Sequence, residues 1–163
     1  MSLNDVRIRE KNDGFVRVIP TEAAATDILA GEPVKMKADG SPYAIPLATG
    51  DPEIGTDQML GIAITASDHT ATADGEVSVF VPGPNSVLEC KATTVANVDT
   101  QAEIDALVND CVTMDLTGSV YTIDEDEGND DNVHGLRIVG GDPNRQVLYF
   151  VVKPKAMSID SEL

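Results

Sequence analysis

The sequence has few aromatic residues and few basic ones. It contains three Phe, three Tyr and no Trp, so a hydrophobic core must come from Val, Ile, Leu and Ala. Eleven basic side chains face 28 acidic ones, which gives a formal net charge of -17. Because such a charge repels phosphate groups, we expect no nucleic-acid partner and no anionic membrane. The excess of acid suits a protein from a halophilic source, and an ordinary acidic surface explains it equally well.

The sequence also lacks the signals of a membrane span, a disulfide framework and a catalytic site. No apolar run approaches the roughly 20 residues that cross a bilayer, and the first residues hold no apolar signal core, which predicts synthesis in a cytoplasm. Cys90 and Cys111 form neither a CxxC pair nor a dense disulfide framework, so they are expected to be free, buried thiols. A bridge between them requires Cα atoms within about 7 Å. The only histidines, His69 and His134, lie near no nucleophile-elbow pattern. We therefore expect no enzymatic activity and no cofactor.

Short alternating segments predict a mainly β fold. One helix is expected over residues 101–110, where Thr100 and Glu103 form a capping box, and residues 21–30 have room for a single helical turn. About nine strands with one helix exclude a parallel α/β sheet, which leaves an antiparallel β-barrel or sandwich. The expected strands cover residues 33–37, 43–47, 59–64, 77–81, 87–92, 112–116, 120–123, 136–139 and 146–152.

The first twenty residues differ from the rest, because they hold four of the eleven basic side chains. Alternation at residues 6–9 and 15–19, around a turn at 12–14 and before a stop at Pro20, predicts an arm or an edge hairpin. Such an arm can add a strand to a neighbouring protein, or it can form an internal edge strand of the same domain. The candidate partner-binding residues are Val6, Arg7, Ile8, Arg9, Lys11, Phe15, Arg17 and Val18. A β-barrel domain is then expected over residues 21–156, with a tail over 157–163.

One segment is rich enough in carboxylates to suggest a metal. Residues 124–132 carry six acidic side chains, which supply the oxygen ligands that Ca²⁺ prefers. The spacing is not that of an EF-hand, so a solvated acidic loop is the competing interpretation. The candidate calcium ligands are Asp124, Asp126, Asp130 and Asp131.

The order of these features resembles a known family of small β-barrel proteins. A strand follows a Gly-acid turn within residues 28–35, a Leu-Gly-Ile-Ala stretch occupies 60–63, and a Gly-Glu-Val-Ser-Val stretch at 75–79 leads to a Pro-Gly turn. A closing hairpin spans residues 136–152. Over residues 28–152 the chain is thus similar to the head decoration (cement) proteins of tailed bacteriophages and archaeal tailed viruses.

The resemblance implies a homotrimer that binds the major capsid protein on the outer surface of a virion and bridges neighbouring capsomers. Two other classes stay open. One is a different virion component, such as a turret base, a tail-tube protein or a capsid accessory domain. The other is a secreted calcium- or carbohydrate-binding β-module, which should show exposed aromatic residues and an export signal.

Overall fold

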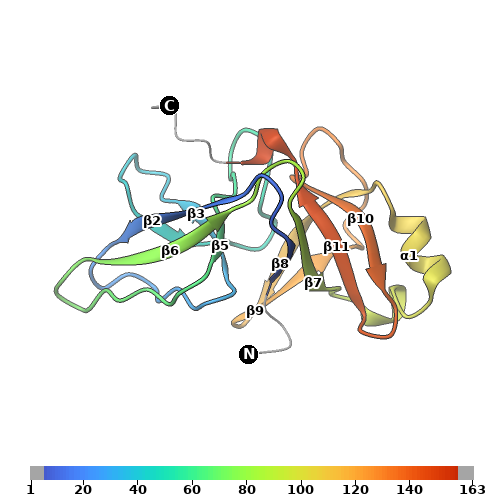
Figure 1. Ribbon diagram of the computed structural model, residues 1–163, viewed down its shortest axis with the longest axis horizontal. Coiled ribbons are helices and arrows are strands. Elements are labelled where there is room, and N and C mark those ends of the chain that lie inside the picture. The colour runs from blue at the N-terminus through green and yellow to red at the C-terminus, as the bar shows by residue number, and fades with distance from the viewer. Residues whose placement is uncertain (1–5, 158–163) are drawn as a thin grey trace.

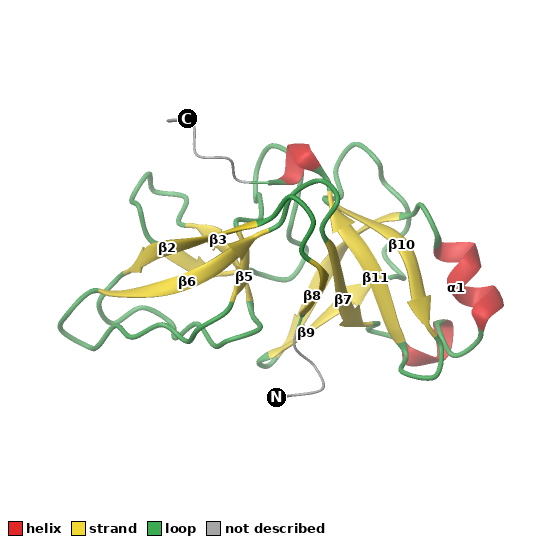
Figure 2. Cartoon of the chain, in the orientation of Figure 1, coloured by secondary structure: helices red, strands yellow, loops and turns green. Residues whose placement is uncertain are grey.

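A computed structural model describes residues 6–157 and has a mainly β architecture with one short α-helix, as the sequence predicts (Figures 1 and 2). Two single-turn 3-10 helices, Val95–Asn97 and Pro154–Ala156, complete the described elements. The strands are β1 (Arg7–Glu10), β2 (Phe15–Thr21), β3 (Pro33–Met36), β4 (Ala44–Pro46), β5 (Gly61–Ala63), β6 (Gly75–Val81), β7 (Val87–Lys91), β8 (Cys111–Thr117), β9 (Val120–Asp124), β10 (Leu136–Asp142) and β11 (Val147–Val152), and the helix is α1 (Gln101–Leu107).

The strands form two antiparallel sheets. One has six strands in the order β1-β7-β11-β10-β8-β9, and the other has five in the order β2-β6-β5-β3-β4. In Figure 1 the five-stranded sheet lies on the left and the six-stranded sheet on the right. The six-stranded sheet curls until β9 returns to the end of β7, where a single bridge joins Ala92 to Ile123. The architecture is consistent with a β-sandwich. Neither sheet closes into a barrel, which was the other architecture that the sequence allowed.

The two N-terminal strands do not pair with each other, so the expected edge hairpin is wrong. β1 pairs with β7 at one edge of the six-stranded sheet, and β2 pairs with β6 at one edge of the five-stranded sheet. The turn expected at residues 12–14 does form, but it carries the chain from one sheet to the other. Pro20 does not stop β2, which continues to Thr21, because an edge strand can accommodate a residue without an N–H.

A second crossover, from β6 to β7, is fastened to the first. The Ser86 hydroxyl donates to the Asn12 carbonyl, and the Asn85 amide donates to the Asp13 carboxylate at 2.6 Å. Gly14 lies so close to the Phe80 ring that a Cβ atom there would be 2.2 Å from Phe80 Cζ. Only glycine fits at this position, and the two crossovers therefore lie side by side over Phe80.

The helix begins where the capping box predicts but ends earlier. Thr100 and Glu103 exchange both capping hydrogen bonds, and Val108 already has extended dihedral angles, so the helix ends at Leu107 instead of residue 110. Asn109 then donates its N–H to the Ile138 carbonyl at 2.8 Å, which turns the chain into β8. The helix packs against β10, where a Cβ atom at Gly141 would lie 3.1 Å from Ile104 Cδ1.

Two further expectations for the first half of the chain need correction. Residues 21–30 form no helical turn, because Ala24 has a φ of 57° and donates its N–H to the Thr70 carbonyl at 2.8 Å. The apolar run at residues 59–64 gives only a three-residue strand, β5. The last residue of the run, Ile64, lies just after this strand and is exposed. The hairpin of β3 and β4 forms as expected.

One continuous hydrophobic cluster contains residues from both sheets. It is mainly aliphatic, and its large aromatic members are Phe80, Tyr121 and Phe150. Tyr121 in β9 donates its hydroxyl proton to the carbonyl of Leu47, next to β4, at 2.7 Å, so this hydrogen bond joins the two sheets. Burial raises the pKa of the Tyr121 hydroxyl far above its usual range, which keeps it a donor.

Both cysteines are free and buried, as the sequence predicts. No helix within residues 6–157 is long and apolar enough to cross a membrane.

Candidate interaction surface

An exposed apolar patch follows β2 along the outward face of the five-stranded sheet. Val16 and Val18 are 56% and 57% exposed. Phe15 at the start of the strand is also exposed, at 52%, but it alternates with Val16 and lies on the opposite face of β2. Val18 pairs with Ser78 on β6, and Ile64, which is 43% exposed, donates its N–H to the Ser78 carbonyl from the other side. We call Val16, Val18 and Ile64 the β2 patch. Exposed apolar clusters of this kind mark contact surfaces more often than isolated exposed residues do.

The sequence explains why β2 shows apolar residues on both faces. Ile19 and Thr21 point into the core and are buried, while Val16 and Val18 alternate with them and point outward. A strand that forms one solvated edge normally carries polar residues on its outward face. The apolar outward face of β2 therefore has no role in the core of this chain.

The outward face of the six-stranded sheet is charged instead. Arg7 on β1 pairs with Glu89 on β7, and Glu89 pairs with Tyr149 on β11, so the three residues form one row across the sheet. The Arg9 guanidinium lies 4.0 Å from the centre of the Tyr149 ring and 3.7 Å from Glu89. Arg145 donates two hydrogen bonds to the Glu89 carboxylate. One glutamate thus holds two arginines against the sheet.

The expected partner-binding residues divide into two groups. Val6 is buried in the core and Ile8 packs against it, so neither is available to a partner, and both were wrongly included. Phe15 and Val18 are exposed on β2, and Arg7, Arg9, Lys11 and Arg17 are at least partly accessible. Both strands pair inside this chain, which corresponds to the internal edge-strand alternative. What remains for a partner is the outer surface of the two strands.

The expected calcium ligands do not converge. Asp126 accepts hydrogen bonds from Thr94 and Asn97, and Asp130 accepts from backbone N–H groups of its own loop. Asp131 instead binds Lys153 at 2.9 Å. Among the described residues, 6–157, no group of three or more His, Cys, Asp or Glu side chains is placed to hold a metal ion. The sequence interpretation of Asp124, Asp126, Asp130 and Asp131 as one calcium site is therefore wrong.

The acidic loop uses its carboxylates to organise backbone. Glu125 is buried and accepts from the N–H groups of Thr93 and Thr94 at 3.0 and 2.9 Å. Glu127 accepts from the N–H and hydroxyl groups of Thr113. Burial raises the pKa of both glutamates. The sequence shows the density of charge here, but nothing in it indicates that these two side chains turn inward.

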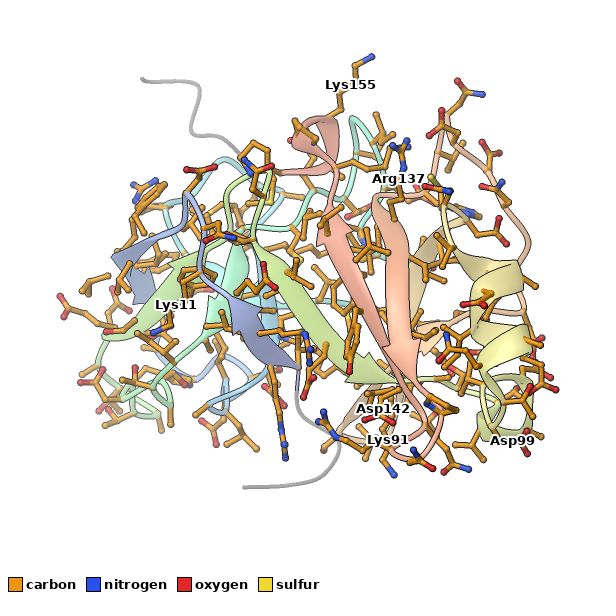
Figure 3. The ribbon with its side chains drawn as sticks, turned by 45° about the vertical axis from the view of Figure 1, so that its right-hand side comes forward. Lys11, Lys91, Asp99, Arg137, Asp142 and Lys155 are labelled. Carbon is orange, nitrogen blue, oxygen red and sulfur yellow. The ribbon has the colours of Figure 1, made fainter. Side chains whose placement is uncertain are left out.

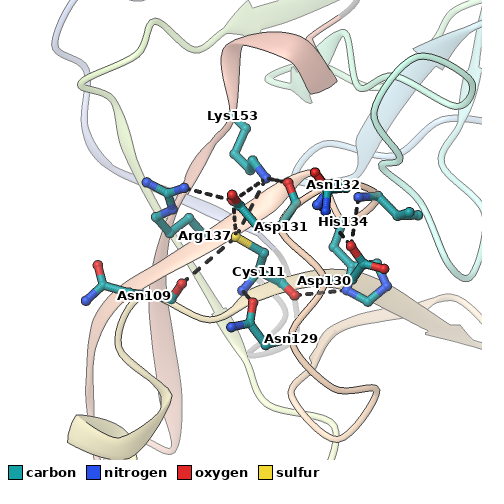
Figure 4. Close-up of polar contacts among 10 residues, drawn as sticks. Asn109, Cys111, Asn129, Asp130, Asp131, Asn132, His134, Arg137 and Lys153 are labelled. Carbon is teal, nitrogen blue, oxygen red and sulfur yellow. Dashed lines mark hydrogen bonds and ion pairs between the residues drawn. The ribbon is translucent and has the colours of Figure 1, made fainter.

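Cys111 lies at the centre of a polar cluster that joins the acidic loop to β10 and to the end of β11 (Figure 4). Its thiol donates to Asp131 Oδ1 at 3.3 Å and accepts from Lys153 Nζ at 3.7 Å. His134 Nδ1 lies 2.9 Å from the Cys111 carbonyl oxygen, not from the thiol. The geometry is that of a fastened loop, without the thiol–imidazole contact that activates a nucleophilic cysteine.

Two depressions lie at opposite ends of the β10–β11 hairpin. A shallow groove of about 520 Å³ lies near its open end, where Figure 3 shows Arg137 and Lys155. A pocket of about 260 Å³ lies near its turn, on the side of the molecule where Figure 3 shows Lys91 and Asp142. The residues that line this pocket come from β1, β7 and the β10–β11 turn, so we call it the β1–β7 pocket.

The sequence analysis did not identify several residues that shape the charged face and the β2 patch. Glu89, Arg145 and Tyr149 hold the charged face together, and Ile64 extends the β2 patch. The alternation of β7 does place Glu89 on the polar face of its strand, but its two arginine partners come from distant parts of the chain. Comparison with family models, with curated proteins and with solved structures found no match to this chain.

Proposed function

We propose that this chain is a capsid decoration protein, which binds the outer surface of a tailed-virus head, bridges neighbouring capsomers and so stabilises the shell. The observation that carries the proposal is the β2 patch. It consists of Val16 and Val18, which are more than half exposed on a strand at the edge of a sheet, and of Ile64 beside them. A chain of net charge -17 has no reason of its own to expose such a patch.

The patch has the chemistry of an interface core. Aromatic and aliphatic side chains that become fully desolvated supply most of the binding energy of protein interfaces, while charged rims set orientation. Val16 and Val18 present the outward face of β2, and Ile64 lies beside them across β6. Burial of each such side chain contributes about 1.5–3 kcal/mol.

The surroundings of the patch favour a protein partner. β2 is hydrogen-bonded to a neighbouring strand on one side only, and an edge strand of this kind can extend a neighbouring sheet. Arg17 lies within the strand, and Lys11 lies just before it. These cations suit an acidic capsid exterior. In this proposal the partner is the major capsid protein, and the decoration protein is a homotrimer on the virion surface.

The contacts of the two histidines support binding over catalysis. His69 Nε2 lies 3.0 Å from the Ala25 carbonyl and 3.4 Å from Asp27. His134 contacts the Cys111 carbonyl and lies 3.7 Å from Glu127. Neither contact activates a hydroxyl or a thiol, so both side chains fasten loops.

The test is co-sedimentation of the purified protein with assembled, expanded capsids that lack it. The double variant Val16→Asp/Val18→Asp should lose at least tenfold in affinity, because two charges replace apolar contacts. Val139→Asp is the matched control, since Val139 is 42% exposed on a strand of the other sheet.

The control should bind as the unmodified protein does. If the double variant, with an unchanged circular dichroism spectrum, still saturates capsids, the β2 patch is not the contact surface. A mass corresponding to a ring of six for the free protein would favour a tail-tube component instead of a trimeric decoration protein.

A further inference from the structure

The β1–β7 pocket concentrates positive charge in a strongly acidic chain. Its lining includes Arg7, Lys91 and Arg145, with the amide side chains of Asn144 and Gln146 beside them. Arg9, next to the lining, lies on the same face of the sheet. Four of the eleven basic residues of the chain thus meet at one end of the six-stranded sheet.

The acidic side chains at this end are already engaged. Glu89 is only 9% exposed and binds both Arg9 and Arg145. Asp142 accepts from the N–H groups of Asn144 and Arg145 at 3.0 and 3.3 Å and so closes the β10–β11 turn. These two carboxylates offset two of the four cations, which leaves a local excess of positive charge.

Arg7 and Lys91 are the cations of this excess. Neither has an ion-pair partner within the described residues 6–157. Arg7 pairs with Glu89 across β1 and β7, and Lys91 follows Glu89 by two residues on the same face of β7. Both side chains therefore project from the outward face at the rim of the pocket.

Two guanidinium groups, one in this pocket and one beside it, are held in place before any ligand arrives. Arg145 is fixed by two hydrogen bonds to Glu89, and Arg9 is held by the Tyr149 ring. A carboxylate is planar and fits the planar fork of an arginine, and the amides of Asn144 and Gln146 supply further donors.

We infer that the β1–β7 pocket is a carboxylate-binding site, with Arg7 and Lys91 as the groups that neutralise the ligand and Arg145 as a positioned donor. The ligand is an acidic side chain of a protein partner or a free organic acid, which share this chemistry. The site itself is independent of the proposed function, and only its use as a second contact with the capsid rests on that function.

The first experiment titrates the full chain with citrate and follows the backbone amide signals by NMR at about 0.1 M ionic strength, where charges interact over about 10 Å. Signals of the pocket residues should shift and saturate. Arg7→Gln and Lys91→Gln should each weaken binding about threefold to tenfold. Lys155→Gln is the matched control, because Lys155 lies at the opposite end of the β10–β11 hairpin (Figure 3).

Three results would overturn the inference. The first is the absence of saturable shifts in the unmodified protein. The second is an equal loss of binding in the control variant, which would mean a nonspecific charge effect. The third is tighter binding of inorganic phosphate than of citrate, which would assign the pocket to a different anion.

The source of the carboxylate is tested separately. A Glu-rich peptide and citrate are compared in the same titration, and the Arg7→Gln/Lys91→Gln double variant is added to the capsid co-sedimentation assay. Weaker capsid binding by this variant assigns the ligand to the capsid. Unchanged capsid binding with lost citrate binding assigns it to a free acid. A protein that binds citrate but no capsid contradicts the proposed function and leaves the site in place.

Discussion

The two sheets present opposite chemistry to the outside. The five-stranded sheet shows the apolar β2 patch, whereas the six-stranded sheet covers its outward face with Arg9, Glu89 and Arg145 around Tyr149. Burial of apolar surface strengthens in many concentrated salts, while exposed ion pairs weaken as salt screens them. The strength of a contact through the β2 patch and the strength of a contact through the charged face should therefore respond to salt in opposite directions. In a salt-rich medium, a contact through the β2 patch should be the one that persists.

The largest effect is expected in the core that the sheets share. Phe150 in the six-stranded sheet and Phe80 in the five-stranded sheet belong to the same continuous cluster. Phe150→Ala and Phe80→Ala should each lower the free energy of unfolding by about 3–5 kcal/mol. Urea titration followed by circular dichroism should show one transition in both variants. Two transitions, of which each variant shifts only one, would mean that the sheets unfold as separate units.

A smaller effect on stability is expected on the charged outward face of the six-stranded sheet. Glu89→Gln should lower the free energy of unfolding by about 1–2 kcal/mol, because two arginines lose their charged partner while remaining partly solvated. Glu76→Gln is the matched control on exposed β6 surface, and it should change stability by less than about 0.5 kcal/mol. Thermal melting compares the two variants. Equal changes would remove Glu89 as an organiser of the charged face.

A still smaller effect on stability is expected for the hydrogen bond that joins the two sheets. Tyr121→Phe removes the hydrogen bond to the Leu47 carbonyl and should cost about 1 kcal/mol. The native-state hydrogen exchange of β4 and β9 should accelerate together, because both ends of the link are released. Faster exchange in β9 alone would show that the hydroxyl does not hold β4.

The smallest effect concerns the polar cluster around Cys111. The ammonium of Lys153, together with the Cys111 thiol and Arg137, holds the pKa of Asp131 well below its usual range. A depressed carboxylate pKa stabilises the fold above about pH 4, and this stabilisation is lost as the pH falls towards the folded-state pKa. In a double-mutant cycle of Asp131→Asn and Lys153→Met, melting temperatures should therefore show coupling at pH 7 that shrinks in acid. Coupling that is constant with pH would exclude an ionic origin.

The elements of this fold that depend on neighbours in the sequence were predictable. Each of the following features depends on residues that lie close together in the sequence: the capping box of α1, the β3–β4 hairpin and the alternation of β6 and β11. The exposed residues Phe15 and Val18 were also identified. Ile64 was not, because an apolar run has the same appearance whether its last residue is buried or exposed.

The sequence by itself determined that the chain is rich in short antiparallel strands, carries one capped helix and has a strongly acidic surface, because periodicity, turn residues and charge are local properties. Only the tertiary structure decided which sheet each N-terminal strand joins. A strand edge can be satisfied by any partner strand, and the choice here depends on the contacts of Ser86 with Asn12 and of Phe80 with Gly14. The same reason applies to the β2 patch and to the β1–β7 pocket, because each combines residues that are distant along the chain.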